Sequence, residues 1–380
     1  MRSRAARPPT SSRRAARRPT RMSVRRPVVW IAVVMATFLA WETWCVLVPG
    51  PVLRDRPIIV QIPPEEGALA VAARLKYAGA IRSPEAFFVL SLAHGSLRAL
   101  KAGEYEVPRS ASTPEVLALL ETGRVRPHVV VHPEGATVAE LARTLERAQL
   151  APAAAMLRTA TDPTFLRAHG IEAPSVEGYP FPDTYQFVRG MTADQILGRM
   201  VERMHAKLRP DIRERARARK LTVHELLTFA SIIEREAVAR DEQRLISAVF
   251  WNRLQQGMPL QADPTVQYAH GKDRQRLRRA DLLRDHPYNT YTRSGLPPGP
   301  IASPGLDAIE AALDPAPVGY LFFVKRDASH HYFSTTLAEH NQAIARYRAS
   351  PAVGERRADP GHAQPPAPPE VEARRGIPKP

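Results

Sequence analysis

The chain has 380 residues, a formal net charge of +16, 37 prolines and a single cysteine. Residues 1–26 hold ten Arg and no Lys, Asp or Glu, so only +6 remains for the rest of the chain. This concentration excludes a basic surface spread over the protein, and we expect no nucleic-acid partner. One cysteine excludes an intrachain disulfide, so any exported domain must be stabilised by its core.

The basic segment 1–26 is followed by residues 27–48, PVVWIAVVMATFLAWETWCVLV. This run has the length needed to cross a hydrocarbon core of about 30 Å. Glu42 lies near its far end, beside Trp41 and Trp44, residues typical of the membrane interface. WETWC contains no cleavage site of the small-x-small type, which argues against a removed signal peptide. We therefore predict an uncleaved single-pass helix in the inner membrane, with residues 1–26 in the cytoplasm and the rest in the periplasm.

Residues 57–79 and 127–149 share one pattern, a short β-branched strand, a Pro-Glu turn with Gly, and an amphipathic helix. The first unit continues into SPEAFFVLSLA, where Ser83-Pro84 fits a helix start, and into AGEYEVP, a short strand. The order strand, helix, helix, strand in residues 58–125 resembles a LysM-like module, a fold that binds N-acetylglucosamine polymers. A plain packing domain remains the alternative.

Residues 126–350 are predicted to form a mixed α+β domain, which makes the whole chain α+β in class. Its loops contain aromatic and hydrogen-bonding residues together, in EGYPFPDTYQF (177–187), SAVFWNRLQQGMPLQADPTVQYA (247–269) and PYNTYTRSGLPPGPIASPG (287–305). Such residues line carbohydrate clefts, where rings stack on sugar faces and amides bind hydroxyls. Residues 351–380 are rich in Pro, Ala and charge without periodicity, and we expect a disordered tail.

A carboxylate interrupts the apolar face of a predicted helix over residues 223–240, which includes FASIIEREA. At about 100° per residue, Glu234 lies close to the apolar stripe, whereas Glu236 lies on another side with Arg240 one turn on. Glu234 is therefore a candidate functional group. A carboxylate satisfied by an Arg or a backbone donor is the structural alternative.

No metal or cofactor is expected. CxxC, HExxH, GxGxxG and GxxxxGK[ST] are all absent from the sequence. The pair His330-His331 lacks a helical ligand spacing, and we interpret it as surface or substrate-facing.

Four ordered stretches resemble the endolytic murein transglycosylase family, also called MltG or YceG-like. They are EGYPFPDTY, ASIIERE, VFWNRLQQGMPLQADPTVQY and YNTYTRSGLPPGPIASPG, and the resemblance covers about residues 58–348. It implies an anchored enzyme that cleaves the MurNAc-GlcNAc bond of nascent peptidoglycan strands, leaves 1,6-anhydro-MurNAc ends and terminates elongation. Peptidoglycan and the membrane are the implied partners, with cell-wall synthases as candidate protein partners.

The resemblance also implies site residues. Glu234 matches the catalytic glutamate, and Glu236 is a candidate for a supporting role. The expected substrate-binding residues share loops of the matched stretches: Glu177, Asp183, Tyr185, Gln261, Asp263, Thr265, Asn289 and Tyr291.

One acid suffices for a lytic transglycosylase, because it protonates the leaving oxygen and then takes the proton of the attacking C6 hydroxyl. A glycoside hydrolase of the muramidase type, using water, would need a second carboxylate such as Asp263 or Glu177. A membrane-anchored wall-binding scaffold without activity is a further alternative.

Overall fold

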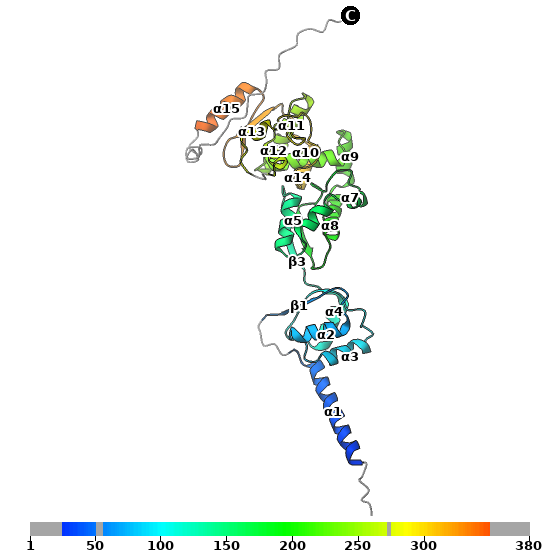
Figure 1. Ribbon diagram of the computed structural model, residues 1–380. Helices are drawn as coiled ribbons and strands as arrows, with labels where there is room; N and C mark the ends of the chain where they lie inside the picture. Colours follow the sequence, from blue (N-terminus) through cyan, green and yellow to red (C-terminus); the bar gives the residue numbers. More distant parts are fainter. Residues whose placement is uncertain (1–24, 51–55, 272–274, 350–380) are drawn as a thin grey trace, which may run out of the picture. The chain divides into compact units, whose positions relative to one another are not determined.

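The computed structural model describes residues 25–50, 56–271 and 275–349, which divide between Val125 and Arg126 into two compact units (Figure 1). Helices predominate, and the described residues form three separate two-stranded antiparallel sheets. The expected mixture of helix and sheet is thus confirmed. The predicted Pro-rich tail and nearly all of the basic tail lie outside the described residues.

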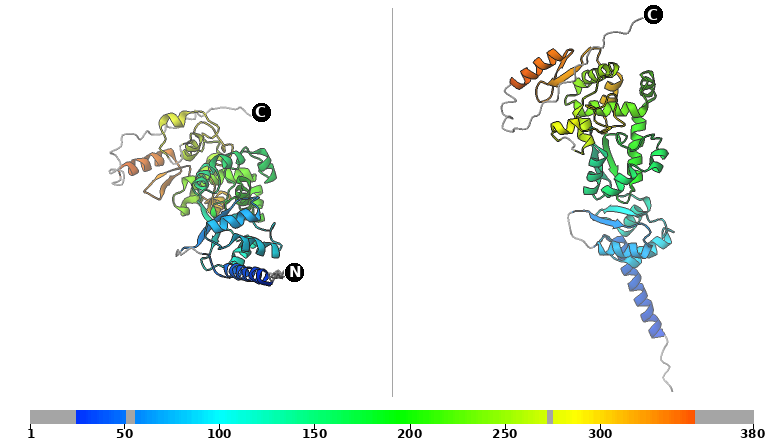
Figure 2. Two further views of the ribbon diagram at one scale, coloured as in Figure 1. Left: turned by 60° about the horizontal axis from the view of Figure 1, so that its bottom comes forward. Right: turned by 45° about the horizontal axis from the view of Figure 1, so that its top comes forward.

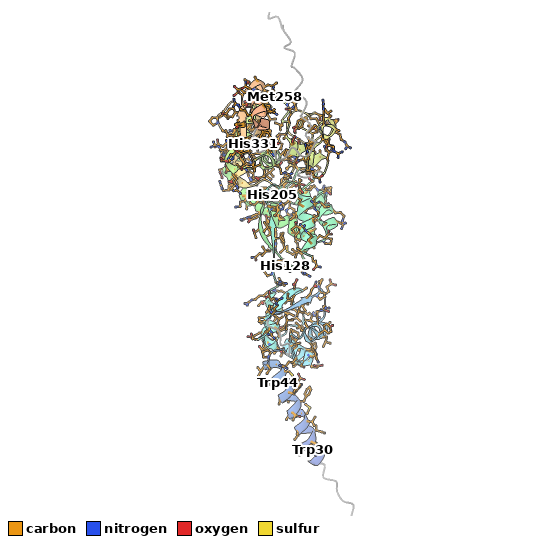
Figure 3. All side chains as sticks on the ribbon, turned by 90° about the vertical axis from the view of Figure 1, so that its left-hand side faces the viewer. Trp30, Trp44, His128, His205, Met258 and His331 are labelled. Carbon is orange, nitrogen blue, oxygen red and sulfur yellow. The ribbon has the colours of Figure 1, made fainter. Side chains whose placement is uncertain are left out.

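The first unit begins with α1 (Arg25–Leu47), an apolar helix of about 35 Å at 1.5 Å per residue. Its stretch Val28–Leu47 is long and apolar enough to cross a membrane. Figure 3 places Trp30 and Trp44 toward opposite ends of this helix. An apolar N-terminal helix is therefore present where the sequence predicts one.

The rest of the first unit contains the strand, helix, helix, strand order that the sequence predicts. Its elements are β1 (Ile58–Ile62), α2 (Ala68–Tyr77), α3 (Pro84–Ala93), β2 (Gly103–Val107) and a further helix, α4 (Thr113–Thr122). Strands β1 and β2 are antiparallel, with Val60 opposite Tyr105. The Ser83 hydroxyl accepts the N–H of Ala86 and so caps α3, as expected of a serine before proline. Phe87 and Tyr105 are fully buried in this unit's core.

The second unit opens with a strand and helices that lead to its central helix. In order they are β3 (His128–His132), α5 (Val138–Arg147), α6 (Ala153–Thr159), α7 (Pro163–Ala168), β4 (Asp183–Phe187), α8 (Ala193–Lys207) and α9 (Pro210–Ala218). Strands β3 and β4 pair antiparallel, with His132 opposite Asp183.

The remainder of the second unit packs around one buried helix. Its elements are α10 (Val223–Glu236), η1 (Arg240–Glu242), α11 (Gln243–Gln255), α12 (Asp263–Ala269), α13 (Arg279–Leu283), α14 (Leu306–Leu313), β5 (Phe322–Lys325), β6 (His331–Ser334) and α15 (Leu337–Ala349). Helix α10 contacts α11, α12 and α14, and α15 lies beside the hairpin of β5 and β6 (Figure 2). Eight consecutive residues of α10, from Leu226 to Ile233, are buried.

The predicted helix over residues 223–240 is correct at its start and wrong at its end. Thr222 and Glu225 form a capping box, which fixes the N-terminus. Helix α10 ends at Glu236 because Ala237 is extended, with φ −72° and ψ 121°. Arg240 therefore lies in η1, beyond the helix.

Candidate active site

Two carboxylates, Glu234 and Glu236, lie in the last turn of α10. The buried residues of this helix hold it in the core, so its C-terminal turn is fixed in position. Both carboxylates are partly buried. Their surroundings differ, and the difference decides what each can do.

Glu234 contacts the start of α14. Its Oε2 accepts the N–H of Gly305, the residue that caps α14, at 3.0 Å. Burial raises the pKa of Glu234, this backbone hydrogen bond opposes the rise, and the charges of Glu134 and Asp307 add to it. Glu234 therefore joins α10 to α14 as well as being a titratable group.

Glu236 is held as a neutral acid near pH 7. Burial raises its pKa to about 8, and the charge of Asp263 contributes to the rise, whereas Lys325 and Arg253 oppose it. A carboxyl group with this pKa keeps its proton at the pH where a general acid must deliver one.

The expected pairing of Glu236 with Arg240 is wrong. Arg240 donates to Glu134 at 2.6 Å and to Asp307 at 2.8 Å. Because α10 ends at Glu236, Arg240 is not one helical turn away from it. Glu236 thus turns away from the exposed charges and toward α12.

Asp263 and Tyr291 form the other side of the Glu236 environment. The Tyr291 hydroxyl donates to Oδ1 of Asp263 at 2.5 Å, and burial, followed by the charge of Asp263, raises the pKa of Tyr291. The backbone N–H of Tyr291 donates to Oδ1 of Asn289 at 2.9 Å, which fixes the loop carrying the ring. The structure thus brings Glu236 together with two predicted substrate-binding residues, Asp263 and Tyr291.

A second network holds the two loops against each other. The hydroxyls of Thr265 and Thr290 lie 2.9 Å apart, and both threonines are buried. The N–H of Gln261 donates to the Thr290 carbonyl at 3.0 Å. Gln261 adopts φ 52°, a left-handed conformation that is uncommon for a residue other than glycine and is typical of functional loops.

Asn289 is fully buried, and its amide groups are already used. Its Nδ2 donates to the carbonyls of Leu282 and Arg284 at 3.0 and 2.7 Å. Together with the bond from Tyr291, these contacts make Asn289 the residue that shapes its loop.

Glu177 is buried at the start of α5. Both of its carboxylate oxygens accept the N–H of Val138, at 3.0 and 3.3 Å. Burial raises the pKa of Glu177 to about 8, and its charge acts on Tyr268 and Tyr288. Glu177 therefore has the burial and the raised pKa that are typical of a functional acid. Both of its carboxylate oxygens, however, are hydrogen-bonded to the N-terminus of α5.

Asp183 and Tyr185 lie on β4 and contact other groups. Asp183 pairs with Arg203 at 2.8 Å, and the Tyr185 hydroxyl donates to the Phe181 carbonyl at 2.6 Å. Tyr185 also stacks on Phe187. These contacts account for both side chains within the fold.

Two cations near Glu236 were missed by the sequence reasoning. Arg253 is buried, and burial lowers its pKa; it donates to the carbonyls of Leu260 and Leu321 at 2.8 and 2.7 Å. The sequence contains a signal for the burial of Arg253, because Arg253 lies three residues after the buried Phe250 and therefore on the same face of α11. Lys325 ends β5, and no local pattern brings it to Glu236.

The interpretation of His331 as surface or substrate-facing is wrong. His331, labelled in Figure 3, is 7% exposed and bonds Glu242 twice, through Nδ1 at 2.7 Å and through its backbone N–H at 2.9 Å. Glu242 belongs to η1, which begins four residues after the end of α10. The pair therefore attaches the β5 and β6 hairpin, and with it Lys325, to the site.

The described residues contain no group of three or more His, Cys, Asp or Glu placed to hold a metal ion. The chemistry that this arrangement supports is proton transfer by a partly buried carboxylic acid with a raised pKa.

Comparisons with known proteins point to one family. The model of the YceG-like family matches residues 60–346. An endolytic murein transglycosylase of Bacillus subtilis (strain 168) is 32% identical over 318 residues, covering 79% of this chain and 88% of that protein. One of Streptococcus pneumoniae serotype 2 (strain D39) is 30% identical, covering 79% of this chain and 60% of that protein.

A solved structure agrees with these matches. The crystal structure of a YceG-like protein from Listeria monocytogenes is 34% identical, has a TM-score of 0.53, and covers 76% of this chain and 99% of that chain. The family match extends over both units and includes α10, the Asp263 loop and the Tyr291 loop. The chain belongs to the YceG-like family.

Proposed function

We propose that the chain is an endolytic lytic transglycosylase that cleaves the MurNAc-GlcNAc bond of nascent peptidoglycan strands. It leaves 1,6-anhydro-MurNAc ends and terminates elongation of the strand. The observation that carries the mechanism is Glu236, a carboxylic acid with a pKa raised to about 8, beside Asp263 and the Tyr291 ring. The relatives that are named endolytic murein transglycosylases support the substrate class.

In this mechanism Glu236 acts twice. Its carboxyl group first donates a proton to the glycosidic oxygen, so the bond from that oxygen to C1 of MurNAc breaks and the leaving sugar departs as an alcohol. The carboxylate then accepts the proton of the C6 hydroxyl while that oxygen bonds to C1. The 1,6-anhydro ring closes without water, and Glu236 regains its proton.

Glu236 is favoured over Glu234 by its surroundings. Each carboxylate accepts one backbone N–H, Glu234 from Gly305 and Glu236 from Asp263, and such a bond favours the charged form in both. Burial nevertheless raises the pKa of Glu236 to about 8. Among the neighbouring charges, Asp263 has the largest effect on Glu236, and its negative charge favours the protonated form of the Glu236 carboxyl group. Glu234 stays a candidate acid, and substitution of each residue separates the two.

Asp263 and Tyr291 have supporting roles in the proposal. An Asp263 carboxylate stabilises positive charge that develops at C1 as the bond breaks, and its hydrogen bond fixes the Tyr291 ring for contact with a sugar. Gln261 and Thr265 set the backbone of the Asp263 loop.

The first unit is proposed to be LysM-like and to help hold glycan strands. Support comes from β1, α2, α3 and β2, which follow one another around a single core. Pull-down of residues 56–125 with purified peptidoglycan tests this role, and binding no stronger than that of a matched control protein would leave only packing.

Helix α1 is proposed to anchor the chain in the inner membrane, with residues 1–26 in the cytoplasm and the part of the chain that follows α1 in the periplasm. The ten Arg that precede the apolar span support this topology. A reporter that is active only in the periplasm should be active when fused after Arg56. Activity of a cytoplasm-dependent reporter at the same position would show that the chain has the opposite orientation. Cell-wall synthases remain proposed partners.

Mass spectrometry of digested peptidoglycan tests the reaction class. The purified chain should release glycan fragments ending in 1,6-anhydro-MurNAc. Reducing MurNAc ends alone would establish the muramidase alternative, with Asp263 or Glu177 as second carboxylate. A folded protein that binds glycan and releases nothing would instead be a wall-binding scaffold.

A further inference from the structure

The outer end of α1 is built into the first unit. The Ser83 hydroxyl donates to Glu42 at 2.8 Å, and the Thr113 hydroxyl donates to the Cys45 carbonyl at 3.3 Å. Cys45 is only 2% exposed. The last turns of the apolar helix thus contact α3 and α4 directly.

The residues around this junction leave little freedom. The Arg82 guanidinium lies 4.7 Å from the centre of the Trp44 ring, a cation–π contact. Past the helix, Gly50 lies so close to the turn at Gly79 that an added Cβ would be 2.2 Å from the Gly79 carbonyl oxygen. These contacts hold the outer end of α1 against the start of α3.

Helix α3 is apolar on its outer side as well as on its core side. Its sequence PEAFFVLSLA has one charged residue, Glu85. Phe87 and Ser91 are buried in the core, whereas Val89 is 63% exposed and Leu92 is 57% exposed. Figure 1 draws α3 at the end of the first unit from which α1 leaves. Exposed apolar side chains at this place need a covering environment.

We infer that α3 lies in the interfacial layer of the membrane that α1 crosses, with Val89 and Leu92 in contact with lipid. The inference rests on the proposed anchor. Trp41 and Trp44 mark the level at which α1 enters the interface, and α3 contacts α1 at this level. A short apolar helix held there buries its exposed face among lipid chains, and Arg82 reaches the phosphate groups.

Lipid contact accounts for two features together. It covers Val89 and Leu92, and it gives the Trp44 and Arg82 pair an interfacial setting. A separate contact explains why Glu42 is tolerated in an apolar helix. Glu42 lies at the N-terminus of α3, where the helix dipole and the Ser83 hydroxyl stabilise a carboxylate. In this arrangement the part of the first unit that follows α1 is fixed at the membrane surface.

Depth-dependent quenching tests the inference on the full chain in vesicles of phosphatidylcholine and phosphatidylglycerol. Single cysteines replace Val89, Leu92 and, as a matched exposed apolar residue on β1, Ile59, which is 50% exposed. Each carries an environment-sensitive fluorophore in a Cys45→Ala background and in parallel in the natural background, where Cys45 is buried. A label at Val34 reports the anchor itself.

Labels at Val89 and Leu92 should be quenched several-fold more by doxyl lipid than the label at Ile59, which aqueous iodide should quench. If lipid quenches Val34 whereas Leu92 behaves like Ile59, the inference is wrong and the anchor stands. If lipid does not quench Val34, the anchor fails and the inference fails with it. Shielding of the label at Leu92 from both quenchers, together with disulfide cross-linking between unlabelled Leu92→Cys chains, would show that a second copy covers α3 instead.

Discussion

The Tyr291 hydroxyl is hydrogen-bonded to the Asp263 carboxylate at 2.5 Å, and that carboxylate is the charge that most raises the pKa of Glu236. One aspartate thus connects a candidate sugar-contacting ring with the candidate acid. A change at Asp263 should therefore alter the pH dependence of the reaction as well as its rate.

Asp263→Asn should move the alkaline limb of activity to lower pH. The wild-type kcat/KM should fall as pH rises through about 8, because the acid must be protonated in the free enzyme. Without the negative charge of Asp263, the pKa of Glu236 decreases, so activity is lost at a lower pH. A pH profile on isolated glycan strands measures this, and an unchanged limb would exclude Glu236 as the titrating acid or Asp263 as its neighbour.

Lys325→Met should shift the same limb in the opposite direction. The Lys325 ammonium lowers the pKa of Glu236, so its removal lets that pKa rise. The two variants form a matched pair with opposite signs. A shift in one direction for both would indicate a general disturbance of the site.

Much of the fold could be predicted from the sequence, because runs of apolar residues and helix caps depend on neighbouring residues only. Examples are the apolar run of α1, the capping residue Ser83 and the start of α10. The end of α10 could not be predicted, since no Gly or Pro stops the helix there and no local pattern marks Ala237 as extended.

The sequence-based choice of Glu234 over Glu236 as the inward carboxylate also depended on where α10 ends. Projection on a long helix placed Glu234 inward and Glu236 with Arg240. The structure takes Arg240 to Glu134 and Asp307 and gives Glu236 a neighbour from α12. Contacts between distant segments, such as His331 with Glu242, have no periodic signal in either segment.

His331→Ala should destabilise the second unit. The substitution leaves the buried Glu242 carboxylate without its side-chain partner, which typically costs about 1–3 kcal/mol. Thermal unfolding should show a lower Tm, and activity should fall because the hairpin that carries Lys325 is released. His330→Ala is the control, since His330 is more exposed. Equal Tm values for the two variants would contradict the anchoring role.

Gly178→Ala should be more destabilising than Gly190→Ala. Both glycines have positive φ, 83° and 90°, so both substitutions strain the backbone. At Gly178 the added Cβ would also lie 2.3 Å from Cβ of Pro300, whereas nothing lies within 4 Å at Gly190. Denaturant unfolding of the two variants compares strain alone with strain plus a clash. Equal losses would show that the Pro300 loop moves freely.

Glu236→Gln should abolish most turnover while preserving the fold. The amide keeps the size of the side chain but cannot deliver a proton, so kcat should fall by roughly 10² to 10⁴, the usual contribution of a general acid. Glu234→Gln keeps an oxygen that can accept the Gly305 N–H, so its loss should be much smaller. Release of 1,6-anhydro products from purified strands measures both. The reverse order would make Glu234 the acid, as the sequence resemblance implies.

A folding measurement separates chemistry from stability in the same two variants. Glu236 keeps its proton up to about pH 8 in the folded chain, whereas its ordinary pKa is 4.5. The folded state therefore binds an extra proton between these values, and the free energy of unfolding decreases as pH rises through this window. Glu236→Gln removes this contribution, so its stability should decline less steeply from pH 5 to 8 than that of the wild type, although Glu177 adds a decline of its own. A stable Glu236→Gln protein with near-normal turnover would leave Glu236 with a purely structural role.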